Sequence, residues 1–515
     1  MRKTEVGKVY LVGAGPGDPE LITTRGLRHL RAADVVLYDA LVHPDQLKQC
    51  RPDAERVFVG KRAGRKSERQ EIINRHMVRA ARAGKRVVRL KGGDPYLFGR
   101  GSEEAEALAA EGIAFEVVPG VPSPMAAAAY TGISLTHRDL ASSIAYVTAT
   151  ESPEKDRSAH DWSKLATATQ TLVLFMGLRK LEILMQLLVD HGRDAETPAA
   201  VVQWASLPRQ RTVVGTVGDI AARVREAGIE MPALTIVGDA VRLREQLRWF
   251  DARPLFGRRV LVTRPVHQAG SLSQLLRDEG AEPVEAPTIR ILPPEDAAAL
   301  RRAVASLASY GWVVFTSKNG VEAFFGELAR QGGDARRLGG ARVIAIGPKT
   351  AQALEACGVR PDRVPDEYRG EAVADEVLAD LGGAPETARV LVPRAREARA
   401  VLPERLRAAG ARVDVVEAYR TVPPTDEDAA RLRALFDEGA LDVVTFTSSS
   451  TVRNLVDALG PGAAERIGAV TVASIGPITT ETARQLGLRV DVTAEQYTTA
   501  DLVQALRDHF EQHER

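Results

Sequence analysis

The stretch RVLVTRP at residues 259–265 returns as RVLVPRA at residues 389–395, an offset of 130 residues. FTS at 315–317 returns in the same way at 446–448. A repeating unit of this length is about the size of one domain. Two similar copies that face each other form a cleft, which is a common place for a ligand. Nothing before residue 250 shares the pattern, so the sequence predicts two unlike parts in one chain.

Each copy of the repeat alternates apolar stretches with polar turns. IGP at 346–348 returns at 475–477, and Tyr368 returns as Tyr497, both with an offset of 129 residues. Apolar stretches that lead into a polar turn and then a helix predict an α/β fold in both copies. The expected strands are 260–262, 313–315, 343–346, 390–392, 443–446 and 472–475.

Composition excludes several classes of protein. The chain has 515 residues and a net charge of +1, from 69 basic and 68 acidic residues. No overall field therefore attracts nucleic acid, and any anionic ligand must be held by local Arg and Lys. The length predicts three or four domains. Cys50 and Cys357 are the only cysteines, so neither a disulfide scaffold nor a cysteine zinc site is expected, and we expect no metal.

The sequence pattern contains neither a membrane span nor a secretion signal. No apolar run approaches the roughly 18–20 residues of a membrane span. The basic residues 1–3 are followed by a short apolar stretch at 9–12 that ends in glycines, which is typical of a strand rather than a signal peptide. We expect a cytoplasmic protein with neither a membrane nor a nucleic-acid partner.

Three glycine-rich turns follow expected strands in the first part of the chain: GAGPGD at 13–18, KGGDP at 91–95 and PGVPSP at 119–124. In open α/β sheets, ligands bind at the carboxyl ends of the strands. Glycine there lets a ligand approach the backbone amides, although βα turns also use glycine for structure alone. Strands that alternate with helices predict a largely parallel α/β sheet. The expected strands are 8–12, 35–38, 86–90, 115–118, 144–148, 171–175, 199–202 and 233–237, with helices at about 22–31 and 103–111.

GAGPGD differs from the dinucleotide-binding pattern Gly-x-Gly-x-x-Gly. Its third glycine comes one position early, and Pro16 has no N–H to offer a pyrophosphate. The spacing therefore disfavours a nucleotide-dependent dehydrogenase.

Residues 8–250 resemble the uroporphyrinogen-III C-methyltransferases of the tetrapyrrole methylase family. The stretches that carry the resemblance occur in the family's order: VYLVGAGPGDPELIT (9–23), ADVVLYDALV (33–42), VFVGKRAG (57–64), RVVRLKGGDPYLFGRG (86–101), EVVPGVPSPMAAAAYTGISLTHRD (116–139) and TLVLFMG (171–177). The resemblance implies two α/β subdomains, at about 1–120 and 121–250, with S-adenosylmethionine in the cleft between them. It also implies a homodimer formed through this part.

Family roles carry over where residues match. The resemblance implies Asp39 and Lys61 as the acid–base pair. Asp39 ends an expected strand and Lys61 follows another, so both are expected at one sheet edge, where a carboxylate near a cation can help a proton move. Ala205 stands where the family commonly has glycine. The cofactor-binding residues that the resemblance implies are Pro16, Gly92, Gly93, Asp94, Leu97, Pro122, Ser123, Met176 and Ala205. Nearby cations that are candidates to pair with substrate carboxylates are Arg62, Arg65, Arg89, Arg100 and Arg138.

Residues 258–515 resemble uroporphyrinogen-III synthase. The carrying stretches are RRVLVTRP (258–265), GWVVFTSKNGVEAF (311–324), VIAIGPKTAQAL (343–354), RVLVPRA (389–395), VEAYRT (416–421), VVTFTSSSTV (443–452) and ASIGPITTETA (473–483). The resemblance implies a two-lobed fold after a linker at 251–257. One lobe joins 258–288 to 422–515, and the other is 289–421.

The repeat gives a physical reason for a binding cleft in the synthase-like part. Both copies place a Thr-Ser turn after a strand and a Gly-Pro turn before a helix. Hydroxyls and free amides at helix starts favour carboxylates, although such residues often only cap helices. Tyr419 matches the tyrosine that assists hydroxyl departure in the family, and an interdomain structural role is nearly as plausible for it. The implied substrate-binding residues are Thr263, Arg264, Ser317, Lys349, Thr350, Arg394, Thr447, Ser448, Ser449 and Thr479.

These observations predict a bifunctional enzyme of tetrapyrrole biosynthesis. The second part would cyclise hydroxymethylbilane to uroporphyrinogen III, and the first would methylate that product at C2 and C7 to give precorrin-2. Two alternatives remain open on the sequence. One is a methyltransferase that acts later, on a corrin ring, fused to the synthase. The other is a two-lobed binding protein without enzymatic activity.

Overall fold

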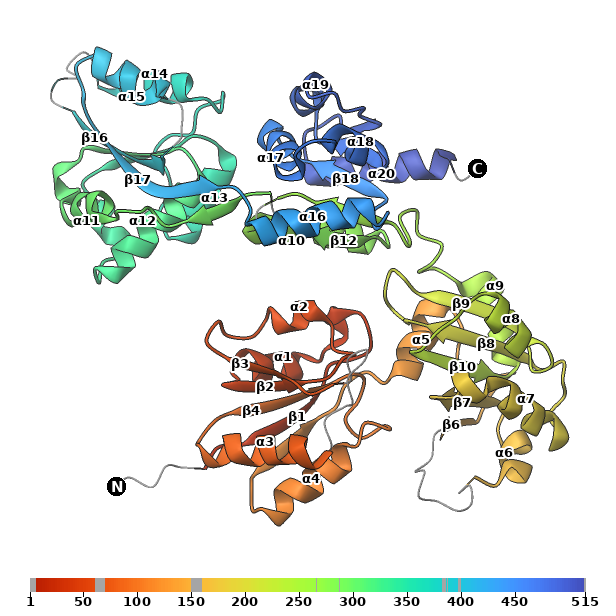
Figure 1. The fold of residues 1–515 in the computed structure, drawn as a ribbon. Coiled ribbons are helices and arrows are strands. Elements are labelled where there is room, and N and C mark those ends of the chain that lie inside the picture. Colours follow the sequence, from red (N-terminus) through yellow and green to blue (C-terminus); the bar gives the residue numbers. More distant parts are fainter. Residues whose placement is uncertain are drawn as a thin grey trace. The chain divides into compact units, whose positions relative to one another are not determined.

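The computed structural model describes residues 6–60, 70–149, 160–264, 266–286, 288–381, 386, 388–396 and 400–513. Contacts divide the chain into two compact units (Figure 1). The first comprises Met1–Arg259, Gln274–Pro283 and Leu506–Arg515, and the second Val260–Ser273 and Val284–Ala505. The domain boundaries expected from the sequence differ from this division and stay a prediction.

The first sheet of the first unit is wholly parallel, in the order β3-β2-β4-β1-β5. Helices α3 and α4 cover one face of it, and α1 and α2 lie over the other (Figure 1). Since both faces are covered, the central strands are apolar along most of their length, as expected of a parallel sheet. The elements are β1 (Val9–Gly13), α1 (Thr24–Arg31), β2 (Val35–Tyr38), α2 (Pro44–Leu47), β3 (Glu55–Phe58), α3 (Gln70–Arg82), β4 (Val87–Lys91), α4 (Gly101–Ala110) and β5 (Phe115–Val118).

The second sheet corrects the expectation of largely parallel strands. Its order is β6-β7-β10-β8-β9, and only the β6–β7 pair is parallel among the described pairs. Strand β9 was not expected from the sequence. It forms a hairpin with β8 across residues 204–210, and a short connection of this kind permits only antiparallel pairing. The elements are α5 (Ser123–Thr131), β6 (Ile144–Thr148), α6 (Trp162–Ala168), β7 (Thr171–Phe175), α7 (Leu181–Asp190), β8 (Pro198–Gln203), β9 (Arg211–Thr216), α8 (Ile220–Glu226) and β10 (Ala233–Val237).

The segment that follows α9 (Arg244–Leu247) packs on α5. The ring centroids of Trp249 and Phe250 lie 5.5 Å and 4.8 Å from that of Tyr130, and the indole N–H of Trp249 donates to the carbonyl of Ala129 at 2.7 Å. Phe250 is 4% exposed and Leu255 fully buried. The linker expected at 251–257 stays a prediction, and Leu255 within it is buried.

The synthase-like part contains two sheets, in the orders β12-β11-β18-β19-β20 and β13-β17-β16-β14-β15. Strand β11 pairs in parallel with β18, so the start of this part shares a sheet with residues far along the chain. The strands are β11 (Arg259–Val262), β12 (Glu282–Glu285), β13 (Arg290–Leu292), β14 (Trp312–Phe315), β15 (Arg342–Ala345), β16 (Arg389–Ala395), β17 (Arg412–Val422), β18 (Val443–Phe446), β19 (Thr471–Ser474) and β20 (Val492–Thr493). The helices are α10 (Val266–Asp278), α11 (Ala298–Ala305), α12 (Lys318–Arg330), α13 (Pro348–Ala356), α14 (Gly370–Asp380), α15 (Val401–Ala408), α16 (Asp426–Asp437), α17 (Ser449–Leu459), α18 (Ala463–Gly468), α19 (Pro477–Gln485) and α20 (Thr499–His513).

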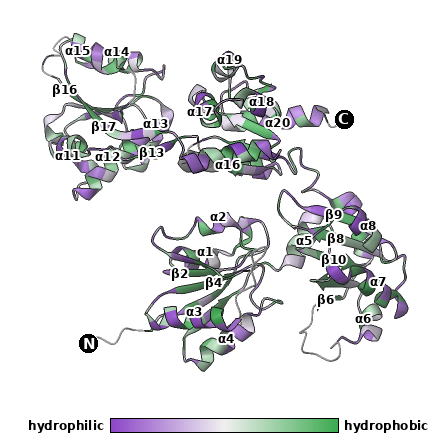
Figure 2. Ribbon diagram, viewed as in Figure 1, coloured by the Kyte–Doolittle hydropathy of each residue, from purple (hydrophilic) through white to green (hydrophobic). Residues whose placement is uncertain are grey.

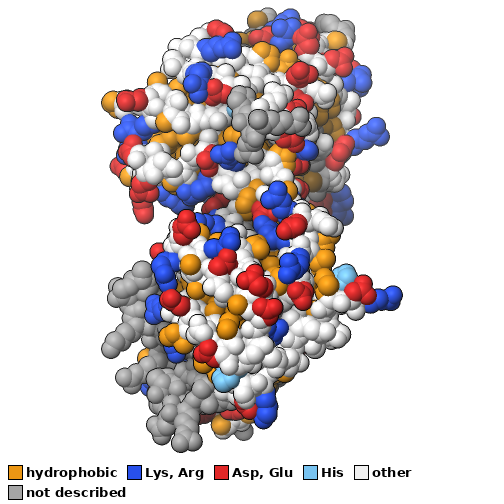
Figure 3. Space-filling model, turned by 90° about the vertical axis from the view of Figure 1, so that its right-hand side faces the viewer, with side chains coloured by type: hydrophobic (Ala, Val, Ile, Leu, Met, Phe, Trp, Pro, Cys, Tyr) orange, Lys and Arg blue, Asp and Glu red, His pale blue; other side chains and the backbone are white. Residues whose placement is uncertain are grey.

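The repeat extends to the packing of the two cores. Phe315 and Phe446 end equivalent strands, β14 and β18, and both are fully buried. Figure 2 shows the apolar residues gathered along the strands, with hydrophilic residues on the outer turns of the helices. On the face seen in Figure 3, acidic and basic side chains are interspersed, in keeping with a net charge of +1. No helix of the described residues is long and apolar enough to cross a membrane.

Candidate functional site

A cavity of about 470 Å³ lies in the first unit, between its two sheets. Part of its wall comes from the glycine turns after β1 and β4 and from the start of α5. The facing wall comes from the segments after β7 and β8 and from the start of β10. All nine residues predicted to bind the cofactor line it: Pro16, Gly92, Gly93, Asp94, Leu97, Pro122, Ser123, Met176 and Ala205.

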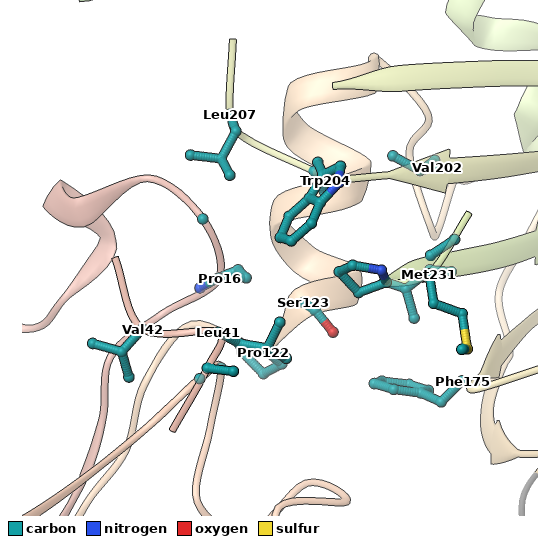
Figure 4. A pocket seen from close by; sticks show the side chains of 18 of the residues that line it. Pro16, Leu41, Val42, Pro122, Ser123, Phe175, Val202, Trp204, Leu207 and Met231 are labelled. Carbon is teal, nitrogen blue, oxygen red and sulfur yellow. The ribbon is translucent and has the colours of Figure 1, made fainter. Parts of the chain in front are cut away.

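Figure 4 shows how the side chains surround this space. Pro16, Leu41 and Val42 approach from the first sheet, while Trp204 and Met231 face them from the second. The volume falls in the usual range of small-molecule sites, and mostly apolar walls with a few polar groups are typical of them.

The turn after β4 leaves room for a ligand at the backbone. A Cβ at Gly93, whose φ is +71°, would meet nothing among the described residues nearer than the backbone nitrogen of Ser123 at 3.9 Å. An adenosyl group combines an apolar face with polar edges, and the residues present suit it. Met176 supplies a pliant wall, and the peptide groups at Gly93 supply polar contacts.

Asp94 has a structural task as well as a place in the cavity wall. Its Oδ1 accepts a hydrogen bond from the backbone N–H of Tyr96 at 2.8 Å, and its Oδ2 accepts one from Gly120 at 3.0 Å. The carboxylate thus ties the KGGDP turn to the PGVPSP turn. Each oxygen keeps a further lone pair for a ligand hydroxyl or amine.

A polar clasp joins the GAGPGD turn to the segment after β8. The Tyr130 hydroxyl donates to Asp18 Oδ2 at 2.6 Å, and the Ser206 hydroxyl accepts from the Asp18 N–H at 3.0 Å and donates to the Pro16 carbonyl at 2.5 Å. Burial raises the pKa of Tyr130, and the bond to Asp18 raises it further. The clasp fixes the width of one end of the cavity.

Gly17 lies at the closest approach within this clasp. Its φ is +72°, and a Cβ there would stand 2.5 Å from both the carbonyl oxygen of Ala205 and the hydroxyl of Ser206. Ala205 therefore presents its backbone to the GAGPGD turn, which explains why a residue larger than glycine is accommodated at that position.

Asp39 lies at the end of β2, beside the cavity wall formed by 40–44. Its Oδ2 accepts from Arg89 Nη2 at 3.1 Å, and its Oδ1 accepts from the Gly92 N–H at 3.2 Å. The predicted partner, Lys61, lies outside the described residues. Arg89 was one of the cations expected to pair with substrate carboxylates, and the structure shows that this expectation is wrong. The side chain is 4% exposed and already binds acidic groups.

Several cavity residues were missed on the sequence. Trp204 stacks against the guanidinium of Arg209, which lies 4.0 Å from the ring centroid. Trp204 and Met176 adopt left-handed backbone conformations, with φ of 49° and 54°, and strained residues of this kind cluster at ligand sites. His43 also lines the cavity, and burial lowers its pKa below the usual value. The only sign of these residues in the sequence was that they lie close to the motifs already recognised.

In the synthase-like part, the structure brings two predicted residues together. The hydroxyls of Ser317 and Tyr419 lie 3.0 Å apart. Ser317 also accepts from the Gly320 N–H at 3.1 Å as the N-cap of α12, and Ser448 accepts from the Thr451 N–H at 3.3 Å as the N-cap of α17. The two copies of the repeat therefore share a capped helix start after a strand that pairs in parallel with its neighbours.

Three of the predicted threonines have buried side chains. Thr263 is fully buried and its hydroxyl donates to the Thr445 carbonyl at 2.9 Å. Thr350 and Thr479 are 4% and 5% exposed. Their side chains pack inside the lobes, so a ligand could directly contact only the backbone groups of these residues.

The remaining predicted residues are nearer the surface. Thr447 and Ser449 are half-buried, and Ser449 Oγ accepts from Thr482 at 2.8 Å. Arg264 follows β11, Lys349 lies in the first turn of α13, and Arg394 lies near the end of β16. Burial lowers the pKa of each. Partly desolvated cations of this kind bind carboxylates more strongly than fully solvated ones. Among the described residues, no group of three or more His, Cys, Asp or Glu side chains is placed to hold a metal ion.

Two families match the chain, in the order expected. The family described as Tetrapyrrole (Corrin/Porphyrin) Methylases matches residues 8–221, and the family described as Uroporphyrinogen-III synthase HemD matches residues 270–504. Each match covers one of the two unlike parts that the repeat separates.

Similar proteins contain one or both parts. "Porphyrin biosynthesis protein HemD" of Ruminiclostridium josui is 38% identical over 98% of this chain and 98% of its own length. "Uroporphyrinogen-III C-methyltransferase" of Bacillus subtilis (strain 168) is 40% identical over 69% of this chain and 74% of its own length. "Siroheme synthase" of Azotobacter vinelandii is 53% identical over 48% of this chain, and the match spans 53% of that protein.

Among solved structures, the native uroporphyrin III C-methyl transferase of Thermus thermophilus is 41% identical over 46% of this chain and 94% of its own, with a TM-score of 0.39. A mutant uroporphyrinogen III synthase of the same species is 20% identical over 50% of this chain and 99% of its own, with a TM-score of 0.38. On the match along nearly the whole length of the HemD relative, the chain belongs to the family of tetrapyrrole-biosynthesis enzymes that join a C-methyltransferase to a uroporphyrinogen-III synthase.

Proposed function

We propose that the synthase part, 258–515, cyclises hydroxymethylbilane to uroporphyrinogen III and that the methyltransferase part, 1–250, methylates this product at C2 and C7 to give precorrin-2. The observation that carries the proposal is a cavity lined by all nine residues expected to hold S-adenosylmethionine. The product of one part is the substrate of the other, which gives a chemical reason for the fusion.

In the methyltransferase part, the cavity residues hold the cofactor and Asp39 acts beside it. When bound, S-adenosylmethionine supplies an electrophilic methyl group. Gly92 and Gly93 present backbone groups, Asp94 accepts hydrogen bonds, and Met176 and Trp204 form the apolar walls. Asp39 acts as the general base that accepts the proton released by the pyrrole system, and Lys61 is the general acid of the pair. Holding the reactants in line supplies much of the acceleration.

In the synthase part, loss of the substrate hydroxyl leaves a reactive chain end that must close with ring D inverted. Tyr419 assists the departing hydroxyl by hydrogen bonding, and Ser317 orients the phenol. Arg264, Lys349 and Arg394 bind substrate carboxylates, together with the exposed amides at the helix starts. Thr447, Ser448 and Ser449 form the equivalent turn of the other lobe.

We further propose that the protein is cytoplasmic, needs no metal and forms a homodimer through the methyltransferase part. Its partners are then small molecules. Light scattering of the purified protein at several concentrations measures the oligomeric state, and a monomer at all of them would contradict the dimer.

The decisive experiment gives the purified protein hydroxymethylbilane with and without S-adenosylmethionine and identifies the macrocycles by mass spectrometry and NMR. We expect uroporphyrinogen III without the methyl donor and precorrin-2 with it. Asp39→Ala should lower methylation by about 100-fold or more and leave cyclisation unchanged. Equal loss of both activities would contradict the division of labour, and uroporphyrinogen III that stays unmethylated in the presence of S-adenosylmethionine would favour a later-acting methyltransferase.

A further inference from the structure

Two cations are buried under α4, on the inner face of β4. Alternate residues of a strand point to the same face, so Val87, Arg89 and Lys91 share the side covered by α3 and α4. Val87 joins the apolar core there, whereas Arg89 and Lys91 bring charges to it, and they are only 4% and 3% exposed. Isolated charges in such a place cost far more free energy than a fold can supply, so each requires an anionic partner.

Glu104 of α4 supplies the first anion. It is fully buried, and its Oε1 accepts hydrogen bonds from Arg89 Nε at 3.0 Å and from Lys91 Nζ at 3.0 Å. Gln70, at the start of α3, donates to the same oxygen at 3.2 Å. Burial and the charge of Arg89 lower the pKa of Lys91. One carboxylate between two cations leaves a surplus positive charge.

Asp39 supplies the second anion. Arg89 uses its Nη2 for Asp39 Oδ2, at 3.1 Å, while its Nε remains with Glu104, and its Nη1 donates to the Leu90 carbonyl at 3.1 Å. The guanidinium therefore lies between two carboxylates, with its three nitrogens all engaged. A planar group bound in this way has a fixed orientation.

Three of the four charges are buried and the fourth is partly exposed. The side chains of Glu104, Arg89 and Lys91 are at most 4% exposed, whereas the Asp39 side chain is 28% exposed. Asp39 is thus the member that can reach a ligand, and the other three are held behind it. Its second oxygen is bound by the N–H of Gly92, a residue of the cavity wall.

We propose that Arg89, oriented by Glu104, is the positioning residue that holds the Asp39 carboxylate at the methyl-donor cavity. This inference rests on the proposed function, since it gives Asp39 its part in methyl transfer. Among the described residues, no member of the cluster belongs to the lining of the cavity. Asp39 is the member that adjoins it, because the residues 40–44 that follow it and its hydrogen-bond partner Gly92 form part of the wall, so Arg89 and Glu104 act through Asp39. Lys91 balances the buried charge of Glu104, and the cluster is neutral with both carboxylates ionised.

The test measures kcat and KM for methyl transfer, the affinity for S-adenosylhomocysteine by calorimetry, and the melting temperature of the full chain. The variants are Arg89→Met, Arg89→Lys and Glu104→Gln. Arg82, at the end of α3, and Glu111, just after α4, form an exposed ion pair between the two helices that also carry Gln70 and Glu104. Arg82→Met and Glu111→Gln are therefore matched controls. We expect Arg89→Met to lower kcat about 10- to 100-fold, a share of what a general base contributes. KM and S-adenosylhomocysteine affinity should change less than about threefold.

Arg89→Lys keeps the charge but reaches only one carboxylate, so it should recover part of kcat. If Arg89→Met does not fold, Arg89→Lys and Glu104→Gln carry the test, because the lysine keeps the positive charge with one ion pair and the amide keeps the shape of the glutamate. The controls should keep kcat within about twofold. Radiolabelled methyl donor makes the residual rate of Asp39→Asn measurable, and adding Arg89→Lys or Arg89→Met to that variant should cost less than about twofold more.

The outcomes separate the two levels of the claim. A wild-type protein that transfers no methyl group overturns the proposed function. An active wild-type protein overturns only the positioning role if the Arg89 variants keep kcat within about twofold of it. The positioning role is also overturned if the Arg89 substitutions lower kcat by the same factor in the Asp39→Asn protein as in the wild type. A residue with a merely structural role would lower both rates alike.

Discussion

The phenol of Tyr419, on the long strand β17, lies 3.0 Å from the hydroxyl of Ser317, which caps α12. Tyr419 was assigned a role only from the family resemblance, whereas Ser317 belongs to the repeat that this sequence itself shows. The contact between their hydroxyls connects the two. The helix start fixes the serine, and the serine orients the tyrosine.

Tyr419→Phe removes the hydroxyl and keeps the ring. We expect the rate of conversion of hydroxymethylbilane to uroporphyrinogen III to fall about 100-fold, since one hydrogen-bond donor to a developing charge has about this effect. Ser317→Ala should also slow the reaction and should cost about 1 kcal/mol as a lost N-cap. Ser448→Ala removes the equivalent cap in the other copy and serves as the stability control. Cyclisation by Tyr419→Phe within about twofold of wild type would contradict the role.

Tyr130→Phe tests the clasp at the end of the methyl-donor cavity. The lost bond joins a hydroxyl to a carboxylate and is worth about 2 kcal/mol, so the melting temperature should fall by about 4–8 °C. The affinity for S-adenosylmethionine should weaken several-fold, because the clasp sets the width of the cavity. Tyr146→Phe is the control, as the Tyr146 hydroxyl meets the weak acceptor Met125 Sδ, at 3.6 Å. Equal effects of the two variants would refute the clasp.

Gly17→Ala places a methyl group 2.5 Å from the Ala205 carbonyl oxygen. Gly112→Ala is a matched control, because Gly112 has a similar φ of +65° and an open surrounding. Both variants lose about 1 kcal/mol to the left-handed backbone. Gly17→Ala should lose about 1–3 kcal/mol more and bind S-adenosylmethionine more weakly. Denaturant unfolding and calorimetry measure these differences, and identical behaviour of the two variants would argue against close contact at Gly17.

We expect His43 to make methyl-donor binding sensitive to acid. Burial, the largest cause, lowers its pKa below 6.5, so the imidazole in the cavity wall is neutral at neutral pH. The unfolded chain takes up a proton near pH 6.5 and the folded chain only at lower pH, so stability falls as the pH drops through this window. The imidazolium then repels the sulfonium cation. The folded chain takes up this proton only at a pH below 6.5, so we expect S-adenosylmethionine affinity to fall there, S-adenosylhomocysteine to respond less, and His43→Gln to flatten the difference. An affinity ratio that stays unchanged down to the lowest pH at which the protein is folded would exclude this role.

The sequence predicted those elements whose cause is local. The apolar runs 35–38 and 443–446 appear in the structure as strands with the expected bounds, because buried parallel strands are apolar at nearly every position. The edge strand 115–118 also has the expected bounds. The nine cofactor-binding residues that the family resemblance implied all line the cavity, and most of them lie in glycine-rich turns at strand ends.

Other features depend on contacts that no local pattern encodes. Strand β9 is half exposed and lacks a strong apolar run, so its hairpin with β8 was not predicted. Arg89 looked like a surface cation, because only the approach of Glu104 from α4 makes its burial possible. Trp204 enters the cavity through a left-handed backbone conformation that its sequence does not indicate.

The pairing of β11 with β18 has a consequence for biosynthesis. The hydroxyl of Thr263 can form its hydrogen bond only after the ribosome has added Thr445, whose carbonyl accepts it 182 residues later in the chain. At about 5–20 residues per second, a ribosome needs roughly 10–40 s to deliver it. During that interval the apolar strand β11 lacks its partner β18, and an unpaired strand edge of this kind is prone to bind other chains.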